Sequence, residues 1–223
     1  ILGLDTLLVL LTVIGGRVVP AFTTNALRRD GVEPLPSASS KRGVAAVLSV
    51  VALAVADLVL PGSTITGVIS IIAGLLIANR MIGWRTPKVL NSPILWILHL
   101  GYGWLAVGLI LKGVALVTGV VTEITAIHAL TIGAIGSMTM GVMSRAALGH
   151  TGRELKVTTA IATAYLLISL AAIIRIASGV LPARLHDEAV LASGAVWITA
   201  FLIFAATYWP ILTRPRVSLE RNE

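Results

Sequence analysis

The sequence contains no cysteine. Disulfides, iron–sulfur clusters, zinc–thiolate sites, cysteine-ligated haem and covalently attached c-type haem are therefore excluded. Any metal ion bound by this chain must be held by histidine, methionine, tyrosine or carboxylate side chains, or by a porphyrin.

Charged residues are also scarce. Only 12% of the 223 residues are charged and only 10 are acidic, whereas 57% are hydrophobic. A soluble globular chain is about one quarter charged. Ten acidic residues are too few to cover the surface of a water-soluble protein of this size, so much of the apolar surface must face a lipid bilayer.

Aromatic residues make up only 5% of the chain, with 3 Phe, 3 Tyr and 5 Trp, although the net charge is +7. A basic protein that binds nucleic acid usually presents a basic face, and often aromatic side chains on which bases stack. Here the Lys and Arg residues are confined to short stretches between apolar runs. The pattern predicts contact with a lipid bilayer and its anionic headgroups, and it excludes nucleic acid as a partner.

Seven apolar segments are present, and a helix needs about 20 mostly apolar residues to cross a bilayer. The sequence therefore predicts an all-α fold, a polytopic transmembrane bundle of about seven spanning helices. Residues 1–223 are expected to form a single transmembrane domain without a soluble domain. The predicted spans are residues 1–22, 44–60, 64–82, 93–117, 122–147, 156–179 and 188–212.

Basic residues alternate between the successive connections. Their numbers in the six connections and the C-terminal tail run 4, 0, 3, 1, 3, 1 and 3. Basic residues concentrate on the cytoplasmic side of membrane proteins, so the alternation predicts a multi-pass protein with a cytoplasmic C-terminus. The residues counted are Arg28, Arg29, Lys41 and Arg42; Arg80, Arg85 and Lys88; Lys112; Arg145, Arg153 and Lys156; Arg184; and Arg214, Arg216 and Arg221.

Two histidines lie inside predicted spans, where ionisable residues are costly and mark functional sites. His99 is about 9 Å below the cytoplasmic edge of its helix, and His128 is about 9 Å below the outer edge. Each is a candidate metal ligand, or a neutral histidine that bonds to a neighbouring helix. Their depths would differ by roughly 12 Å across a core about 30 Å thick, so we expect them to serve different sites. Tyr102 shares the helix face of His99 and is a candidate cofactor contact.

Further candidates lie near helix ends. Arg17 and Arg175 either extend toward the headgroups or hold an anionic group such as a haem propionate. Arg145 and His150 are near the cytoplasmic end of the fifth span, where His150 is either a metal ligand or part of a helix stop. Asp57 is interpreted as the only buried acid.

The remaining features favour packing over chemistry. Gly133, Ser137 and Gly141 recur at helical spacing, which lets helices approach closely or leaves room for a flat cofactor. Met138, Met140 and Met143 provide thioethers that suit Cu(I), but they do not share one helical face.

Several of these residues together resemble the NnrS family. The order and spacing match over nearly the whole chain. The resemblance rests on Gly16-Arg17-Val18-Val19-Pro20-Ala21-Phe22-Thr23, on the stretch 93–102 with His99, on the run from His128 through Gly133-Ala134-Ile135-Gly136 to Arg145, and on Gly149-His150-Thr151-Gly152-Arg153.

The resemblance implies a polytopic protein of the bacterial inner membrane that contains haem and copper and is associated with nitric oxide metabolism and protection against nitrosative stress. Family members usually have about twelve spans, with a Trp-His-x-His-Glu-Met element in the N-terminal half. This chain has no such element and is expected to match the C-terminal seven spans. Either a preceding portion or another membrane subunit would then complete the site, and an oligomer is a further expectation.

Two other classes of function stay open at this point. A transporter or channel without a cofactor would have broken helices and carboxylates at mid-membrane. A structural subunit would pack within a larger respiratory-type membrane enzyme. Whether the protein is an enzyme is left open.

Overall fold

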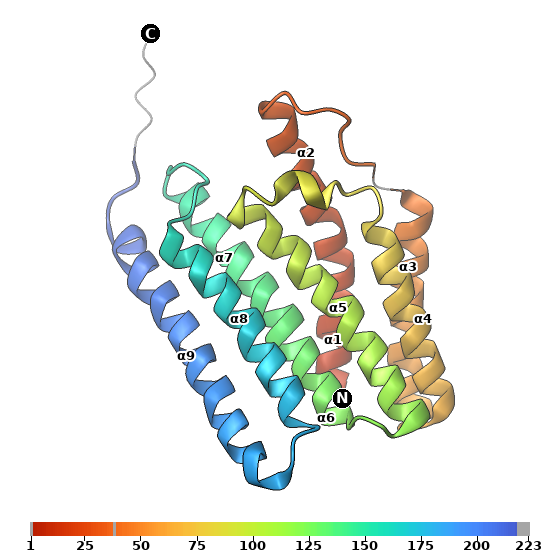
Figure 1. Ribbon diagram of the computed structural model, residues 1–223. Helices are drawn as coiled ribbons and strands as arrows, with labels where there is room; N and C mark the ends of the chain where they lie inside the picture. Colours follow the sequence, from red (N-terminus) through yellow and green to blue (C-terminus); the bar gives the residue numbers. More distant parts are fainter. Residues whose placement is uncertain (1, 38, 218–223) are drawn as a thin grey trace.

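In the computed structural model, which describes residues 2–37 and 39–217, the chain forms a bundle of helices packed side by side (Figure 1). Seven helical segments in the described ranges are long and apolar enough to cross a membrane, and the predicted fold class is confirmed. The spans are Leu2–Arg29, Ser40–Val59 (α3), Thr64–Met81 (α4), Pro93–Thr118 (α5), Glu123–His150, Thr159–Ser178 (α8) and Ala183–Thr213 (α9). Ile1 of the predicted first span and Arg221 of the predicted tail lie outside the described residues.

Two of the spans are interrupted by a π-helical segment, in which the backbone widens. The first span consists of α1 (Leu2–Leu10), η1 (Leu11–Gly15) and α2 (Gly16–Arg29). The fifth consists of α6 (Glu123–His128), η3 (Ala129–Gly136) and α7 (Ser137–His150). Such insertions are frequently found at functional sites. The first span also extends seven residues beyond the predicted boundary at residue 22, because residues 23–29 continue the helix after the apolar run has ended.

Local sequence sets where most spans begin. Ser39, Ser63, Thr122 and Thr158 each precede a helix, and each hydroxyl accepts a hydrogen bond from a backbone N–H of the first turn. These side chains satisfy donors that the helix itself leaves unpaired. α5 begins at Pro93, whose fixed φ suits a first helical position, and ends before Gly119 in the left-handed conformation.

The fourth span, α5, is the centre of the bundle. It packs against α4 on one side and against α6, η3 and α7 on the other, while α9 packs mainly on α8 at one edge (Figure 1). Of the apolar window of α5, 61% is buried, against 17% for α9. Groups on α5 are therefore shielded from lipid, and α9 presents most of its surface outward.

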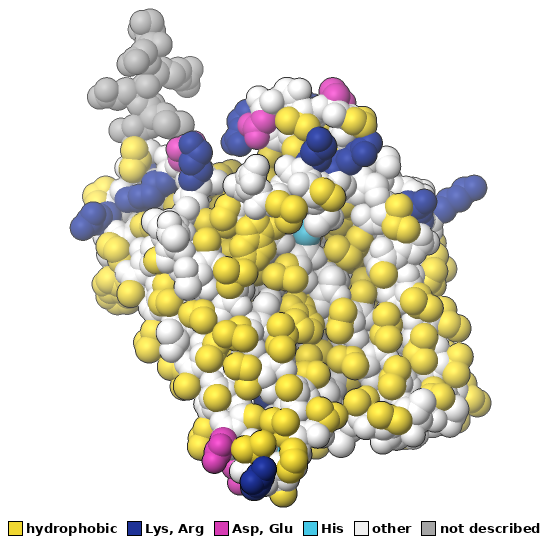
Figure 2. Space-filling model, in the orientation of Figure 1, with side chains coloured by type: hydrophobic (Ala, Val, Ile, Leu, Met, Phe, Trp, Pro, Cys, Tyr) yellow, Lys and Arg dark blue, Asp and Glu magenta, His cyan; other side chains and the backbone are white. Residues whose placement is uncertain are grey.

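The two ends of the bundle differ in charge. One end, here called the basic end, carries the connections 30–39, 82–92 and 151–158 and the tail after α9. Lys and Arg side chains gather at this end of the space-filling view, and yellow apolar side chains cover the flank between the ends (Figure 2). The other end, called the opposite end, carries the turns 60–63, 119–122 and 179–182 (Figure 1). The connections that the sequence counted as rich and poor in basic residues thus alternate between the two ends.

Small residues between α5 and the fifth span serve close packing. A methyl group on Gly101 would meet Met138 at 2.8 Å, and one on Gly133 would meet the Trp104 ring at 2.7 Å. Neighbouring side chains fill the space beside these glycines, which agrees with the packing that the sequence favoured and leaves no room there for a flat cofactor.

Candidate functional site

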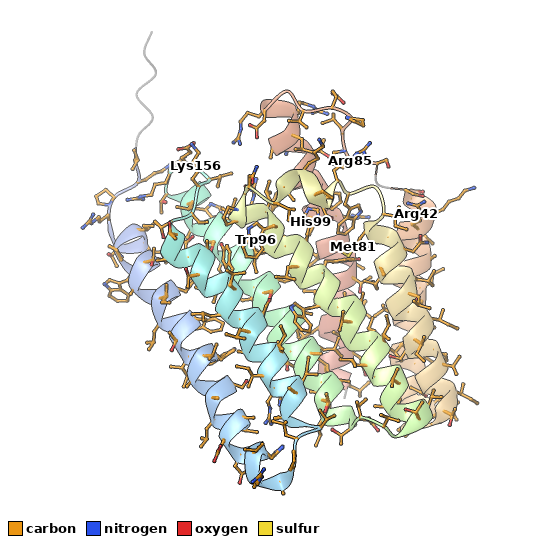
Figure 3. The ribbon with its side chains drawn as sticks, viewed as in Figure 1. Arg42, Met81, Arg85, Trp96, His99 and Lys156 are labelled. Carbon is orange, nitrogen blue, oxygen red and sulfur yellow. The ribbon has the colours of Figure 1, made fainter. Side chains whose placement is uncertain are left out.

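His99 is held on both sides by threonine hydroxyl groups near the basic end. Its Nε2 lies 2.8 Å from Thr23 Oγ1 on α2, and its Nδ1 lies 2.9 Å from Thr86 Oγ1 in the connection after α4. The Thr23 hydroxyl already donates to the Val19 carbonyl, so it accepts from His99 Nε2–H, and Nδ1 accepts from Thr86. His99, which is labelled near the basic end in Figure 3, is 2% exposed. Its ring meets the Trp84 ring edge-on, with ring centroids 5.9 Å apart. The only lone pair of the neutral ring is thus occupied by the Thr86 hydroxyl.

Tyr102 lies one turn along α5 and belongs to a second polar cluster around Arg80. Arg80 Nη1 donates to the Thr12 carbonyl at 2.7 Å and to the Tyr102 hydroxyl at 3.1 Å. Its Nη2 donates to the Gly16 carbonyl at 3.1 Å. Arg80 therefore ties α4 to the π-helical segment of the first span. A side chain at Gly16 would overlap the guanidinium, so only glycine leaves room for it.

Arg17 lies near Arg80 in a groove of about 660 Å³ between the first span and α3. Ser39, Ser40 and Trp84 also line this groove. Two guanidinium groups and serine hydroxyls suit an anionic group such as a carboxylate or a phosphate. Among the residues that the structure describes, no acidic side chain forms an ion pair with Arg17 or Arg80.

Arg145 and His150 lie in a different groove, also of about 660 Å³, between the first and fifth spans. Most of this apolar groove is lined by aliphatic side chains, Met138 and Met143. The Arg145 guanidinium stacks on the Phe22 ring, with its central carbon 3.8 Å from the ring centroid. His150 is exposed. Among residues 2–37 and 39–217, no side chain forms a hydrogen bond or an ion pair with Arg145 or with His150.

His128 and Arg175 lie near each other toward the opposite end of the bundle, on α6 and α8. His128 Nδ1 lies 2.6 Å from the Ile124 carbonyl, so Nδ1 carries the proton and Nε2 carries the lone pair. Histidines that bind metals commonly donate their other ring N–H to a carbonyl in this way. Arg175 Nη1 is buried and has no hydrogen-bond partner among the described residues.

The structure thus brings the predicted residues together in three groups rather than one. Arg145 and His150 share the apolar groove, His99 and Tyr102 both flank Trp84, and His128 is near Arg175. Arg17 lines the groove beside Arg80 and Trp84, which contact the group of His99 and Tyr102. No cluster of three or more His or acidic residues with metal-binding geometry occurs in the described ranges. His99 is near the basic end and α6 is near the opposite end, so His99 and His128 do not meet at one metal (Figures 1 and 3).

Sequence reasoning missed several residues at these places. It counted Arg80 as a loop cation, and it did not single out Trp84, Thr12 or Thr86. It also took Asp57 as the only buried acid, which is wrong, because Asp5 is 3% exposed. One signal was available for Arg80: it is preceded by the apolar run of α4 with no helix breaker, so the helix continues through it.

The segments on which the resemblance rested converge at the basic end, where Thr23 bonds to His99 and Phe22 contacts Arg145. A family model described as NnrS protein matches residues 1–216. No curated protein and no solved structure matches the chain. The match covers nearly the whole chain, so this protein belongs to the NnrS family.

Proposed function

We propose that this protein is a haem-binding, and also copper-binding, membrane protein of nitric oxide metabolism or of protection against nitrosative stress. The observation that carries the proposal is the apolar groove, which brings His150 and Arg145 to the edge of an apolar surface, where no described side chain forms a hydrogen bond or an ion pair with either of them. Membership of the NnrS family supports the same conclusion.

The residues of the apolar groove fit a haem. Its volume of about 660 Å³ lies within the range of roughly 300–1,000 Å³ for ligand pockets. The aliphatic lining would contact the faces of the macrocycle, and Arg145 would pair with a propionate. His150 would hold the iron through an imidazole nitrogen. Bound iron would supply a centre that coordinates nitric oxide, which enters such a groove from the lipid phase.

The same groove offers thioether donors for copper. Met138 and Met143 both line it, and thioether sulfur suits Cu(I). His150 would not belong to this donor set, because Met138 lies about 18 Å from it along the helix and the single lone pair of its ring would be taken by haem iron. Met140 is fully buried and does not line this groove.

A second position for a cofactor is the pair of His128 and Arg175. Among the described residues, the Nε2 lone pair of His128 and the Nη1 of Arg175 have no hydrogen-bond partner, so they would be able to hold haem iron and a propionate. This arrangement supports the expectation of redox sites at two levels of the membrane.

The charge distribution supports a location in the bacterial inner membrane with the basic end in the cytoplasm. The C-terminus would then be cytoplasmic, because the tail leaves α9 at the basic end (Figure 1).

Absorption spectra of four histidine variants test the proposal. His150→Ala and His128→Ala are each expected to change the haem spectrum. His99→Ala is expected to keep it, because Thr23 and Thr86 already engage that ring. His186→Ala is the matched control, because His186 is exposed and bonds only to the Ser178 carbonyl. Spectra that respond to His99→Ala but not to His150→Ala would refute the assignment of the apolar groove.

A transporter without a cofactor is the second candidate, favoured by the π-helical interruptions of two spans. It predicts a purified protein without colour or bound metal.

A further inference from the structure

Three charged side chains are buried together near the opposite end of the bundle, and none of them belongs to the three groups of predicted site residues. Asp5 on α1, Asp57 on α3 and Lys112 on α5 are 3%, 6% and 9% exposed. Lys112 Nζ donates a hydrogen bond to Asp57 Oδ2. Asp5 lies beside this ion pair, close enough to interact with both of its members.

The Asp5 carboxyl group is not satisfied by this arrangement. Its Oδ2 is fully buried and has no hydrogen-bond partner among the residues that the structure describes. Two ionised carboxylates that share a low-dielectric site repel each other, and one of them then takes a proton. If all three groups were ionised, the cluster would carry one net negative charge in a region that solvates charge poorly.

No other charge in the described part of the chain compensates the cluster. On α4, which packs between α3 and α5, the only charged residue is Arg80, at the basic end. The turns 60–63 and 119–122 contain no charged residue, and Glu123 at the start of α6 is exposed. The other titratable group of α6 is His128, which bonds to the Ile124 carbonyl and lies near Arg175. One bound proton is therefore the simplest species that brings the net charge of the cluster to zero.

We propose that Asp5, Asp57 and Lys112 form a proton-binding site in which the two carboxyl groups share one exchangeable proton beside a charged lysine. When the proton binds, an O–H bond forms on the Asp5 carboxyl group, which then donates toward Asp57. When it leaves, the cluster returns to one net negative charge. Asp57 is two residues from the end of α3, so water at that end is within about one helical turn of the cluster.

Infrared difference spectroscopy of the purified protein during a pH titration tests this site. At neutral pH exposed carboxyl groups are ionised. The wild type is therefore expected to show, at neutral pH, a carboxylic acid C=O band from the protonated carboxyl group of the cluster. This band should shift in D2O and disappear at alkaline pH. Asp5→Asn should remove the band and lower the number of protons released by one per chain. Asp187→Asn, which changes an exposed acid at the same end, should leave the band in place.

The variant Lys112→Met tests whether the cluster binds a proton or serves only to hold the helices together. Without the lysine charge, both carboxyl groups must be neutral, so the band is expected to grow about twofold and one more proton per chain is bound. A wild-type protein with no carboxylic acid band at neutral pH would overturn the proposal. So would a band that survives both Asp5→Asn and Asp57→Asn. The wild-type titration needs no variant, so it tests the site even if a variant does not fold.

Discussion

Replacing Gly16 by alanine is expected to displace the Arg80 guanidinium, because the added methyl group would overlap it. Arg80 donates three hydrogen bonds at this position, to the Thr12 and Gly16 carbonyls and to the Tyr102 hydroxyl. A hydrogen bond from a charged group contributes about 1.5–3 kcal/mol. Losing two of them at the lower value costs roughly 3 kcal/mol, and alanine in a helix returns about 1 kcal/mol. We therefore expect a net loss of about 2 kcal/mol in the free energy of unfolding.

Reversible unfolding of the protein in mixed micelles, followed by loss of helical circular dichroism, measures this loss. Gly3→Ala is the matched control, since a methyl group at Gly3 on the same span would meet nothing within 4 Å. It is expected to be neutral or to stabilise the protein by up to about 1 kcal/mol.

A double-mutant cycle with Arg80→Ala isolates the interaction. Once the guanidinium is absent, Gly16→Ala should no longer destabilise the protein, which gives a coupling energy of about 3 kcal/mol. Equal losses in both backgrounds would refute the reasoning, as would a Gly16→Ala variant that is as stable as Gly3→Ala.

Two further perturbations test other parts of the bundle by the same unfolding measurement. Lys112→Met should cost about 3 kcal/mol or more at alkaline pH, because it leaves the Asp57 carboxylate buried and unpaired, and the loss should shrink as the pH falls and a proton replaces the lysine charge. The double variant with Asp57→Asn should recover most of the loss, and failure to recover would contradict the ion pair. Gly133→Ala should cost about 1–3 kcal/mol, because its methyl group would press on Trp104 at 2.7 Å, whereas Gly136→Ala has ordinary contacts and should change stability by less than about 0.5 kcal/mol. Equal effects of the two alanines would contradict the packing described between α5 and the fifth span.

The fold could be predicted from the sequence because crossing a bilayer constrains the composition and length of each segment by itself. Each span needs about 20 apolar residues, and the basic residues between spans follow the side of the membrane. Both signals are read one segment at a time, and neither depends on which helices are neighbours. The end of the first span was harder to predict, because residues 23–29 are helical without being apolar.

The sites were predictable only in part, because they depend on contacts between spans. The residues around Arg80 in the sequence do not show that its side chain points into the bundle and donates to the Thr12 and Gly16 carbonyls, rather than pointing outward. Nothing local to His99 shows that two threonines from distant segments occupy both ring nitrogens. Asp5 was missed because the charged groups that interact with it, Asp57 and Lys112, lie more than fifty residues away along the chain.

Placing Arg145 and His150 together was within reach of the sequence, because they lie five residues apart near the end of one helix. The groove that they share was not, because the first span forms its other wall.

The central claim is that this protein holds haem. The most direct test is the visible absorption spectrum of the purified protein, recorded before and after addition of nitric oxide and combined with analysis of bound iron and copper. The account predicts a haem spectrum that nitric oxide shifts, with iron bound to the protein. A colourless, metal-free preparation whose spectrum does not respond to nitric oxide would contradict it.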